Sequence, residues 1–391
     1  MTDNYDFDKP IDRRNTNCVK WDEFTDPNVI PLWVADMDFE TAPCVIQALK
    51  ARMEHGCFGY TLVPESYYET AIQWFQRRHG WTIDRASFIY TSGVVPALSA
   101  IIKAMTQSGD KVLVQTPVYN CFFSSIRNNG CTLAENPLRM VKNRYEVDWE
   151  DFEQKCADPA VKVFLLCNPH NPAGRVWTRE ELTHMGEICL QHGVFVVSDE
   201  IHCEFTMPAH TYTPFASLSE AFATNCAVCV SPSKAFNIAG LQIANIIVKN
   251  TDIRQKVDKA ININEVCDVN PFGVIALQAA YSAEGEAWLN ALNNYISGNY
   301  QLAKSMLEKG LPHCPVTTLE GTYLLWVDIR QTGFTSQQMT DHLMQHAKVY
   351  VNPGTMYGDT AGEGYIRINL ATQRKLVEEG IGRIISGIHQ C

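Results

Sequence analysis

One lysine stands in an apolar stretch, where its charge calls for a chemical explanation. Lys234 lies in VSPSKAFNIAGLQ, residues 230–242, after two serines and before an apolar run, with no carboxylate nearby in sequence. Burying an unpaired ammonium group is costly, so a lysine in this setting is usually neutral or covalently modified. Lys234 is therefore the first candidate for a residue that takes part in chemistry.

Polar residues occur directly after several apolar runs that are typical of buried strands. In open α/β sheets, ligands bind beyond the carboxyl ends of such strands. The turn at Ser92 and Gly93 also precedes a helical pattern, and the free N–H groups at the start of a helix suit a phosphate. The other residues at expected strand ends are Tyr119, Asn171, Asp199 and Lys234.

Each of these residues also has an ordinary structural explanation, since Tyr119 could cap the core and Asn171 lies in a rigid Asn-Pro turn. One ligand would engage them all, namely pyridoxal phosphate (PLP). Its phosphate would bind at the turn after residue 91, and its ring would stack on Tyr119 and accept a hydrogen bond from Asn171. Its ring nitrogen would pair with Asp199, and its aldehyde would condense with Lys234.

The elements that position these residues alternate between short β-rich runs and helical patterns from about residue 88 to 248. This alternation predicts an α/β fold with a mainly parallel, doubly wound sheet. Long helical patterns and two further strand patterns, TYLLWVDI and YIRINLA, follow and predict a smaller α+β domain. We expect residues 45–285 to form the large PLP-binding domain, and residues 1–44 with 286–391 to form the small one.

The composition favours a cytoplasmic globular protein. The chain has 391 residues and a net charge of −11, which argues against binding to nucleic acid or an anionic membrane. Its start, MTDNYDFDKP, lacks the apolar run of a signal peptide, and no apolar stretch is long enough to span a membrane.

The fourteen cysteines predict reduced thiols rather than a disulfide framework, because no export signal is visible. Cys226 and Cys229 form a CxxC motif inside a predicted strand. Residues three apart on a strand point to opposite faces, so this pair cannot share a metal ion. We expect no metal site.

Three motifs resemble those of the fold-type I PLP enzymes, which have the aspartate aminotransferase fold. They are NPHNPAGR (168–175), SDEIH (198–202) and SPSKAFNIAGLQ (231–242), and the resemblance covers nearly the whole chain. PLWVADMDF (31–39), followed by FGYT (58–61), is similar to the MalY/PatB branch of this superfamily, the cystathionine β-lyase-like C–S lyases.

The resemblance implies a role for each matching residue. Lys234 would be the catalytic lysine that binds PLP and moves a proton, and Arg367 would grip the substrate α-carboxylate. Tyr60 would reach the phosphate in the neighbouring subunit, which implies a homodimer with shared active sites. Cofactor binding is further implied for Gly93, Val94, Tyr119, Asn171, Asp199, His202 and Ser231, and substrate binding for Ala35 and Asn171.

Two positions depart from the aminotransferase pattern. Three residues after Asp199, His202 replaces a tyrosine, so both a packing role and a cofactor role stay open for it. Eight residues after Lys234, Gln242 replaces an arginine that binds phosphate in many relatives. Both departures fit the MalY/PatB branch.

The resemblance implies β-elimination from L-cystathionine or related cysteine S-conjugates, giving pyruvate, ammonia and a thiol. The same residues would serve an aminotransferase acting on L-amino acids, and a PLP-binding regulatory protein also stays open. No second cation for a side-chain carboxylate is evident, which disfavours an aspartate aminotransferase. A nicotinamide-dependent dehydrogenase lacks its GxGxxG motif here, and an aldolase barrel would leave Asp199 and the phosphate turn unexplained.

Overall fold

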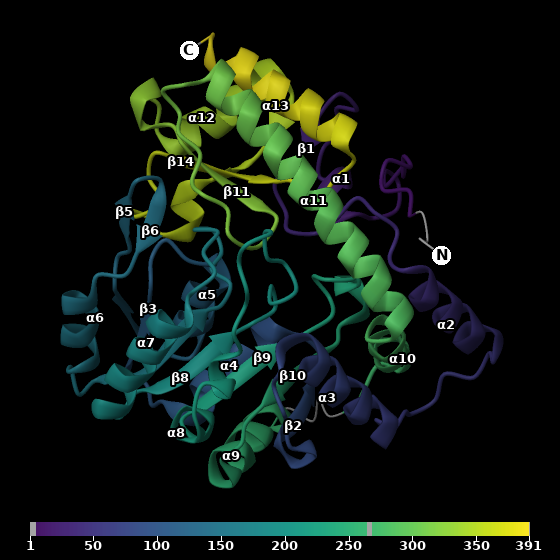
Figure 1. Cartoon of the computed structure of the whole chain (residues 1–391), viewed down its shortest axis with the longest axis vertical. Helices are drawn as coiled ribbons and strands as arrows, with labels where there is room; N and C mark the ends of the chain where they lie inside the picture. Colours follow the sequence, from purple (N-terminus) through teal and green to yellow (C-terminus); the bar gives the residue numbers. More distant parts are fainter. Residues whose placement is uncertain (1–4, 264–267, 391) are drawn as a thin grey trace.

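The computed structural model describes residues 5–263 and 268–390, and its largest sheet has seven strands (Figure 1). These are β2 (Phe88–Thr91), β3 (Lys111–Val114), β4 (Thr132–Glu135), β7 (Val161–Cys167), β8 (Phe195–Asp199), β9 (Cys226–Val230) and β10 (Ala244–Ile247). They lie in the order β2-β10-β9-β8-β7-β3-β4, and β9, β8, β7, β3 and β4 are parallel. The mainly parallel sheet is therefore confirmed.

Strand β10 runs antiparallel to both of its neighbours, β2 and β9. Strands β9 and β10 follow each other in the chain, and an antiparallel pair needs no crossover helix between its strands. Their connection, residues 231–243, instead winds over the end of the sheet and includes only a short 3-10 turn at Ala239–Leu241. This connection places Lys234 beyond the carboxyl end of β9.

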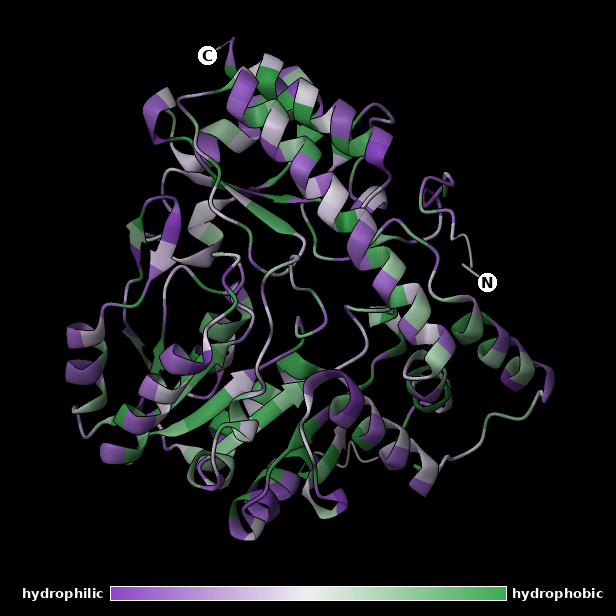
Figure 2. Ribbon diagram, viewed as in Figure 1, coloured by the Kyte–Doolittle hydropathy of each residue, from purple (hydrophilic) through white to green (hydrophobic). Residues whose placement is uncertain are grey.

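Helices cover both faces of the large sheet, and the buried side chains form a separate core cluster on each face. In Figure 2 the strands are mainly green, while the helices show purple surfaces toward solvent. Helix α4 contributes Leu98 and Ile101 to one cluster, and α7 contributes Leu182 and Met185 to the other. The helices of this part are α3 (Glu65–His79), α4 (Val94–Met105), α5 (Asn120–Asn128), α6 (Trp149–Cys156), α7 (Arg179–Gln191), α8 (Glu220–Thr224), α9 (Thr251–Asn262) and α10 (Pro271–Ala280).

The CxxC motif lies in β9, as expected, and its two thiols are buried on opposite faces of the sheet. Cys226 belongs to one core cluster and Cys229 to the other. None of the twelve cysteines among the described residues forms a disulfide bond. None of the described helices is both long and apolar enough to cross a membrane.

The two ends of the chain come together around a second, three-stranded antiparallel sheet. It has the order β11-β14-β13, with β11 (Leu324–Asp328), β14 (Tyr365–Asn369) and β13 (Asn352–Pro353). The N-terminal segment forms a separate two-stranded parallel sheet with the C-terminal part, in which β1 (Ile30–Pro31) pairs with β12 (Val349–Tyr350). The remaining elements are α1 (Val19–Asp22), α2 (Pro43–Glu54), the hairpin β5 (Arg139–Val141) and β6 (Arg144–Glu146), α11 (Ala283–Gly310), α12 (Ser336–His342), a π-helical turn (Leu343–Ala347) and α13 (Arg374–Ile388).

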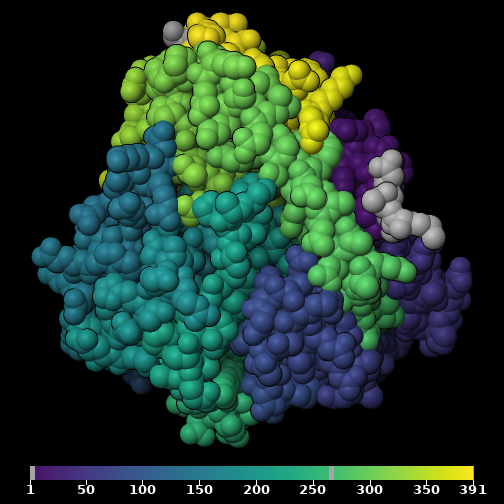
Figure 3. Space-filling view, in the orientation of Figure 1, coloured from purple at the N-terminus to yellow at the C-terminus, as the bar shows by residue number. Residues whose placement is uncertain are grey.

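The N-terminal segment packs against the long helix α11. The ring of Phe7 lies 5.9 Å from that of Trp288 and 5.4 Å from that of Tyr295. Figure 3 shows the purple N-terminal residues against the green and yellow C-terminal half. These contacts support the proposed small domain of residues 1–44 and 286–391, of which residues 1–4 and 391 lie outside the described part. The exact boundary stays a proposal, since α11 begins at Ala283.

Candidate active site

A cavity of about 380 Å³ lies at the carboxyl ends of β7, β8 and β9. Cys167 and Asp199 line it at the ends of β7 and β8, and Lys234 lines it from the connection after β9. Its other walls come from distant parts of the chain, including Trp33 near the N-terminus and Arg367 on β14. The cavity therefore lies where the large sheet meets the two ends of the chain.

Most of the residues predicted for the site line this cavity. Those that do are Ala35, Gly93, Val94, Tyr119, Asn171, Asp199, His202, Lys234 and Arg367. Ser231 and Tyr60 are not among the lining residues. The Ser231 hydroxyl donates to the carbonyl of Ile243 at 2.5 Å and accepts from the Ser233 N–H at 3.0 Å, whereas Ser233 itself lines the cavity. Sequence reasoning missed Ser233, although it stands two positions away in the same motif.

Lys234 is held by a backbone carbonyl rather than by a carboxylate. Its Nζ donates to the carbonyl oxygen of Ala35 at 2.5 Å. Burial lowers the pKa of Lys234 to about 8, while the negative charge of Asp36 opposes this effect. The amine is therefore neutral in about a tenth of the molecules at pH 7 and in about half of them at pH 8, far more than for an exposed lysine, and the neutral form is the one that a nucleophile or base requires.

Asp199 is a buried carboxylate that lacks a cationic hydrogen-bond partner among the described residues. One of its oxygens accepts from the N–H of Ile201 at 3.2 Å. Burial, together with the neighbouring charge of Glu200, raises the pKa of Asp199 to about 7. A protonated ring nitrogen in the cavity would supply the missing partner and restore the ionised form.

Arg367 and Asn171 form a pair that fixes the orientation of the Asn171 amide. Arg367 Nη1 donates to Asn171 Oδ1 at 3.1 Å, and Nη2 donates to the carbonyl of Trp33 at 2.7 Å. Because arginine has no acceptor, the atom facing it must be the amide oxygen, which leaves the amide NH₂ group free to donate elsewhere. Arg367 Nε is buried and has no hydrogen-bond partner among the described residues, so the guanidinium retains a donor for a ligand.

His202 lines the cavity and also packs against aromatic rings. Its ring lies 5.7 Å from the ring of Tyr323 and 6.4 Å from that of Phe205. Burial lowers the pKa of His202 to about 3, and the charge of Lys234 adds to this effect, so the imidazole is neutral. Its Nδ1 is buried, and no residue within 5–263 or 268–390 forms a hydrogen bond with it. The packing role is thus observed, and the cofactor role stays a prediction.

The start of helix α4 is free to bind an anion. Gly93 precedes the helix and provides no side-chain cap for the first N–H groups. These groups have no partner within the helix and carry the positive end of its dipole, which suits a phosphate. Ser233 and Gln242 also line the cavity and could donate to the same ligand.

These features fit PLP. The cavity offers an anion site at α4, an aromatic ring at Tyr119, a half-buried amine at Lys234 and a buried carboxylate at Asp199 that lacks a cation. Among the described residues, Asp199, His202 and Arg367 each present to this cavity a buried polar group that lacks a suitable partner. Buried polar groups are normally paired, so such a concentration indicates a missing ligand.

One group of side chains elsewhere has the composition of a metal site. Among the described residues, only His79, Cys203 and Glu204 bring potential metal ligands close enough together. Glu204, however, already accepts from Trp74 Nε1 and from Arg78 Nε, both at 2.7 Å. The positive charge of Arg78 competes with a metal cation, so we interpret this group as a structural ion-pair network.

Comparison with known proteins agrees with this geometry. The family model for aminotransferase class I and II matches residues 27–384. The chain is 42% identical to cystathionine beta-lyase PatB of Bacillus subtilis, covering 97% of this chain and 98% of PatB, and 32% identical to protein MalY of Escherichia coli, covering 98% and 99%. Cystalysin of Treponema denticola, whose crystal structure contains pyridoxal 5'-phosphate, superposes with a TM-score of 0.95 at 34% identity, with 99% of each chain covered.

The fold, the cavity and these relatives lead to one assignment. The cofactor is PLP, and the relatives that share the whole length of the chain include lyases that act on C–S bonds. The chain therefore belongs to the aminotransferase class I and II family, and within it to the PatB and MalY branch of PLP-dependent C–S lyases.

Proposed function

We propose that this protein is a PLP-dependent C–S β-lyase that cleaves L-cystathionine or related cysteine S-conjugates to pyruvate, ammonia and a thiol. The observation that carries this proposal is the charge content of the cavity. Its ionisable charged side chains among the described residues are Asp199, Lys234 and Arg367. Asp199 and Lys234 would interact with PLP, and Arg367 would bind the substrate α-carboxylate. Among the described lining residues, no cation is then left to bind an acidic substrate side chain.

Four side chains and the start of α4 would hold the cofactor in this proposal. Lys234 would bind its aldehyde carbon, Asp199 would pair with its ring nitrogen and Asn171 would donate to its ring oxygen through the free NH₂ group. Tyr119 would stack on the ring, and the N–H groups that follow Gly93 would bind the phosphate. When bound, PLP acts as an electron sink that makes the substrate Cα proton acidic.

Arg367 binds the substrate α-carboxylate. The guanidinium is buried and held by Asn171 and Trp33, so its direction is fixed before substrate arrives. The guanidinium carbon of Arg367 also lies over the Tyr357 ring, 4.6 Å from its centroid, and this contact helps to fix the orientation of the guanidinium group. A preorganised planar donor suits a carboxylate, and it places the Cα–H bond toward Lys234.

Lys234 moves the protons. As a neutral amine it accepts the Cα proton, and the C–S bond then breaks with its electron pair remaining on sulfur. The resulting ammonium group of Lys234 can donate its proton to the leaving thiolate. The pKa of about 8 suits both steps, because neither protonation state is strongly disfavoured near neutral pH.

A homodimer is part of the proposal. Tyr60 is 95% exposed and lies outside the cavity of its own chain. Two further apolar side chains of the same segment, Phe58 and Leu62, are 51% and 89% exposed. A partner subunit would cover these side chains and place Tyr60 near the partner's phosphate. Sedimentation velocity of the wild-type protein and of the Tyr60→Ala variant tests whether the chain forms a dimer. The affinity of the same two proteins for PLP tests whether Tyr60 contributes to the partner's site.

We also place the enzyme in the cytoplasm. Its acidic charge, together with twelve described cysteines that form no disulfide bond, is typical of a protein from a reducing compartment. Fractionation of the native host, with detection of the protein by antibody, tests this location.

The reaction is tested with purified protein and L-cystathionine, following pyruvate, thiol and the absorbance of the bound cofactor together. Production of pyruvate and homocysteine with an unchanged final cofactor spectrum supports the lyase. Conversion of the cofactor to its amine form, with turnover only after a keto acid is added, would show an aminotransferase. A colourless protein that does not bind added PLP would contradict the cofactor assignment. Lys234→Ala serves as the control, and a biological effect that survived this change would favour a regulatory role.

A further inference from the structure

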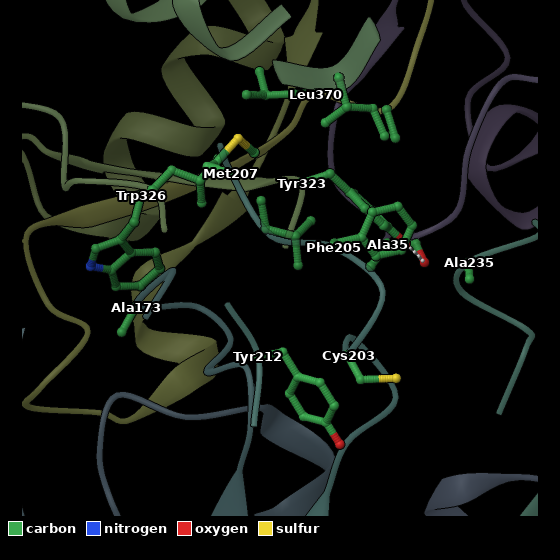
Figure 4. Packing of buried hydrophobic residues seen from close by; sticks show 14 of the residues in the cluster. Ala35, Ala173, Cys203, Phe205, Met207, Tyr212, Ala235, Tyr323, Trp326 and Leu370 are labelled. Atoms are coloured by element: carbon green, nitrogen blue, oxygen red, sulfur yellow. Dashed lines mark hydrogen bonds between the residues drawn. The ribbon is translucent and has the colours of Figure 1, made fainter. Parts of the chain in front are cut away.

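The segment of residues 33–38 faces both cations of the cavity with its backbone. The carbonyl of Trp33 accepts from Arg367 Nη2 at 2.7 Å, and the carbonyl of Ala35 accepts from Lys234 Nζ at 2.5 Å. The hydroxyl of Tyr323 also donates to the Ala35 carbonyl, at 3.1 Å, as the dashed line in Figure 4 shows. Two alternate carbonyls of one segment therefore set the direction of the two side chains on which the chemistry depends.

This segment is not held by a regular sheet or helix. Its backbone is bound instead by amide side chains, since Asn369 Nδ2 donates to the carbonyls of Val34 and Asp36 at 2.6 and 2.7 Å. Asn237 both accepts from the N–H of Met37 and donates to its carbonyl. The position of the segment thus depends on side chains that reach it from other parts of the chain.

Four charged side chains, which we call the N-terminal charge cluster, anchor the far side of the segment. They are Arg13, Lys20, Asp36 and Asp38. Lys20 is fully buried, and its Nζ lies 2.7 Å from Asp38 Oδ2 and 3.8 Å from Asp36 Oδ1. Arg13 reaches Asp36 at 2.6 Å and Asp38 at 2.8 Å, so two cations meet two carboxylates.

The burial of this cluster needs an explanation beyond stability. The desolvation of a buried ion pair often cancels its attraction, and an apolar replacement can be equally stable. Ion pairs do, however, fix geometry, because each charge must meet its partner at a defined distance. Asp36 and Asp38 lie one and three residues after Ala35 in the chain. Their positions therefore constrain where the Ala35 carbonyl meets Lys234.

We propose that the N-terminal charge cluster is a positioning device for the active site, in which Lys20 and Asp38 hold residues 33–38 so that the carbonyls of Trp33 and Ala35 orient Arg367 and Lys234. Lys20 and Asp38 are positioning residues, since they act through this segment and do not line the cavity. The inference rests on the proposed function insofar as that function makes Lys234 and Arg367 the working cations.

The cluster also affects the charge of Lys234. Burial and the positive charge of Arg367 favour the neutral amine, whereas the negative charges of Asp36 and Asp199 and the Cys121 thiol favour the ammonium form. When Asp199 pairs with a ligand cation, Asp36 is the remaining carboxylate that favours the ammonium form. Disruption of the cluster would displace residues 33–38, so the Lys234 ammonium would lose the acceptor at the Ala35 carbonyl and the nearby charge of Asp36, and the pKa of Lys234 would fall.

The test compares wild-type holoenzyme with Lys20→Met, which keeps the length of the side chain and removes its charge. We expect KM for L-cystathionine to rise about tenfold, since small misplacements of a positioned group carry costs of this size or more. We also expect the pH midpoint of the bound cofactor's absorbance to move downward. A second measurement uses the full chain without cofactor, in which mass spectrometry follows the labelling of Lys234 by an amine-reactive reagent. The pH midpoint of this labelling should fall as well.

Two further variants separate positioning from a general loss of stability. Lys20→Arg keeps the charge and should restore KM and both midpoints toward wild type. Arg78→Met breaks a buried ion pair with Glu204 that involves none of residues 33–38, so it should lower stability while leaving KM and both midpoints unchanged. If Lys20→Met does not fold, Asp38→Asn weakens the same pair with almost no change of shape and is measured in its place.

The proposal is overturned if the folded variant has wild-type KM and midpoints, or if Arg78→Met shifts them equally. A wild-type protein that fails to release pyruvate from L-cystathionine would contradict the proposed function alone. The absorbance and labelling midpoints would still test the cluster in that case, because neither depends on turnover.

Discussion

Asp199 and Glu204 are buried carboxylates five residues apart in the chain, and their surroundings differ in kind. Glu204 is surrounded by Trp74, Arg78 and His79, which hold its pKa at about 2 despite burial. In the part of the chain that the structure describes, no such cation is bound to Asp199, and burial raises its pKa to about 7. The chain itself provides cationic partners for a structural carboxylate such as Glu204. For a carboxylate in a ligand site, such as Asp199, the cationic partner is part of the ligand.

The same contrast holds for the two groups of cations. Arg13 and Lys20 meet carboxylates in the N-terminal charge cluster, while Lys234 and Arg367 are held by backbone carbonyls and an amide. Neutral acceptors orient a cation without neutralising it. Lys234 and Arg367 therefore keep their charge or proton for a ligand, which is the property that distinguishes the cavity from the rest of the core.

The largest effect is expected from Lys234→Ala, which removes one of the cavity's unmatched groups entirely. Turnover of L-cystathionine should fall by about a thousandfold or more, because both the covalent link to PLP and the proton carrier are lost. Pyruvate release measures the loss, and circular dichroism controls for folding. Partial recovery on adding a small primary amine would support the role of Lys234 as a base, and wild-type turnover by the variant would contradict it.

Asp199→Asn should separate stability from activity. Because the folded pKa of Asp199 is raised, the cofactor-free protein loses stability as the pH rises from about 4 through about 7. Replacing the carboxyl group with a neutral amide should therefore stabilise the cofactor-free protein at pH 8 by up to about 4 kcal/mol. Turnover should fall about a hundredfold, since the cofactor nitrogen loses its partner.

Urea unfolding of the cofactor-free wild type and variant at about pH 4 and at pH 8 checks this prediction. The two proteins should be similar at the lower pH, where the wild-type carboxyl group is largely protonated, and should diverge at the higher pH. Equal stability at pH 8 would mean that Asp199 has a partner in the cofactor-free protein, and the contrast with Glu204 would fail.

Arg367→Met should raise KM by about a hundredfold, corresponding to about 3 kcal/mol, with a smaller change in kcat. The variant removes the guanidinium that is preorganised by Asn171 and Trp33. Arg367→Lys is the matched control, since it keeps the charge but loses the planar fork, and its KM should lie between those of wild type and Arg367→Met. An unchanged KM in both variants would show that the α-carboxylate binds elsewhere.

Much of the site could be predicted because local sequence encodes where strands end. Tyr119, Asn171, Asp199 and Lys234 each follow a strongly apolar run, and in a parallel sheet such ends meet at one edge. The resemblance implies a phosphate contact for Ser231, whose hydroxyl donates to the carbonyl of Ile243, whereas Ser233 lines the cavity and had no sequence-based expectation. That distinction depends on the carbonyl of Ile243, which approaches only when β10 folds back antiparallel to β9.

Other parts of the structure had no clear local signal. The hairpin of β5 and β6 turns at Lys142 and Asn143, both with positive φ, where Asn-Gly or Asp-Gly would be typical. The contact of Ala35 with Lys234 joins residues 199 positions apart in the chain. Charged residues such as Lys20 and Asp38 are normally exposed, so sequence gave no reason to place them in the core.

The smallest effect on catalysis is expected from Glu204→Gln, which disturbs the matched carboxylate and leaves the cavity intact. The pKa of Glu204 is depressed on folding, so its contribution to stability is present above about pH 4.5 and is lost as the pH falls toward about 2. At pH 7 the variant should be less stable by about 3 kcal/mol, because Arg78 keeps a buried charge without its full partner. The turnover of L-cystathionine should stay close to wild type at temperatures where the variant is folded.

Urea unfolding at pH 7 and at about pH 3 measures the loss of stability, and the difference from wild type should shrink at the lower pH. A large loss of turnover in the folded variant would mean that the ion-pair network around Glu204 also positions His202, two residues away, and the separation between structural and ligand-binding carboxylates would then be incomplete.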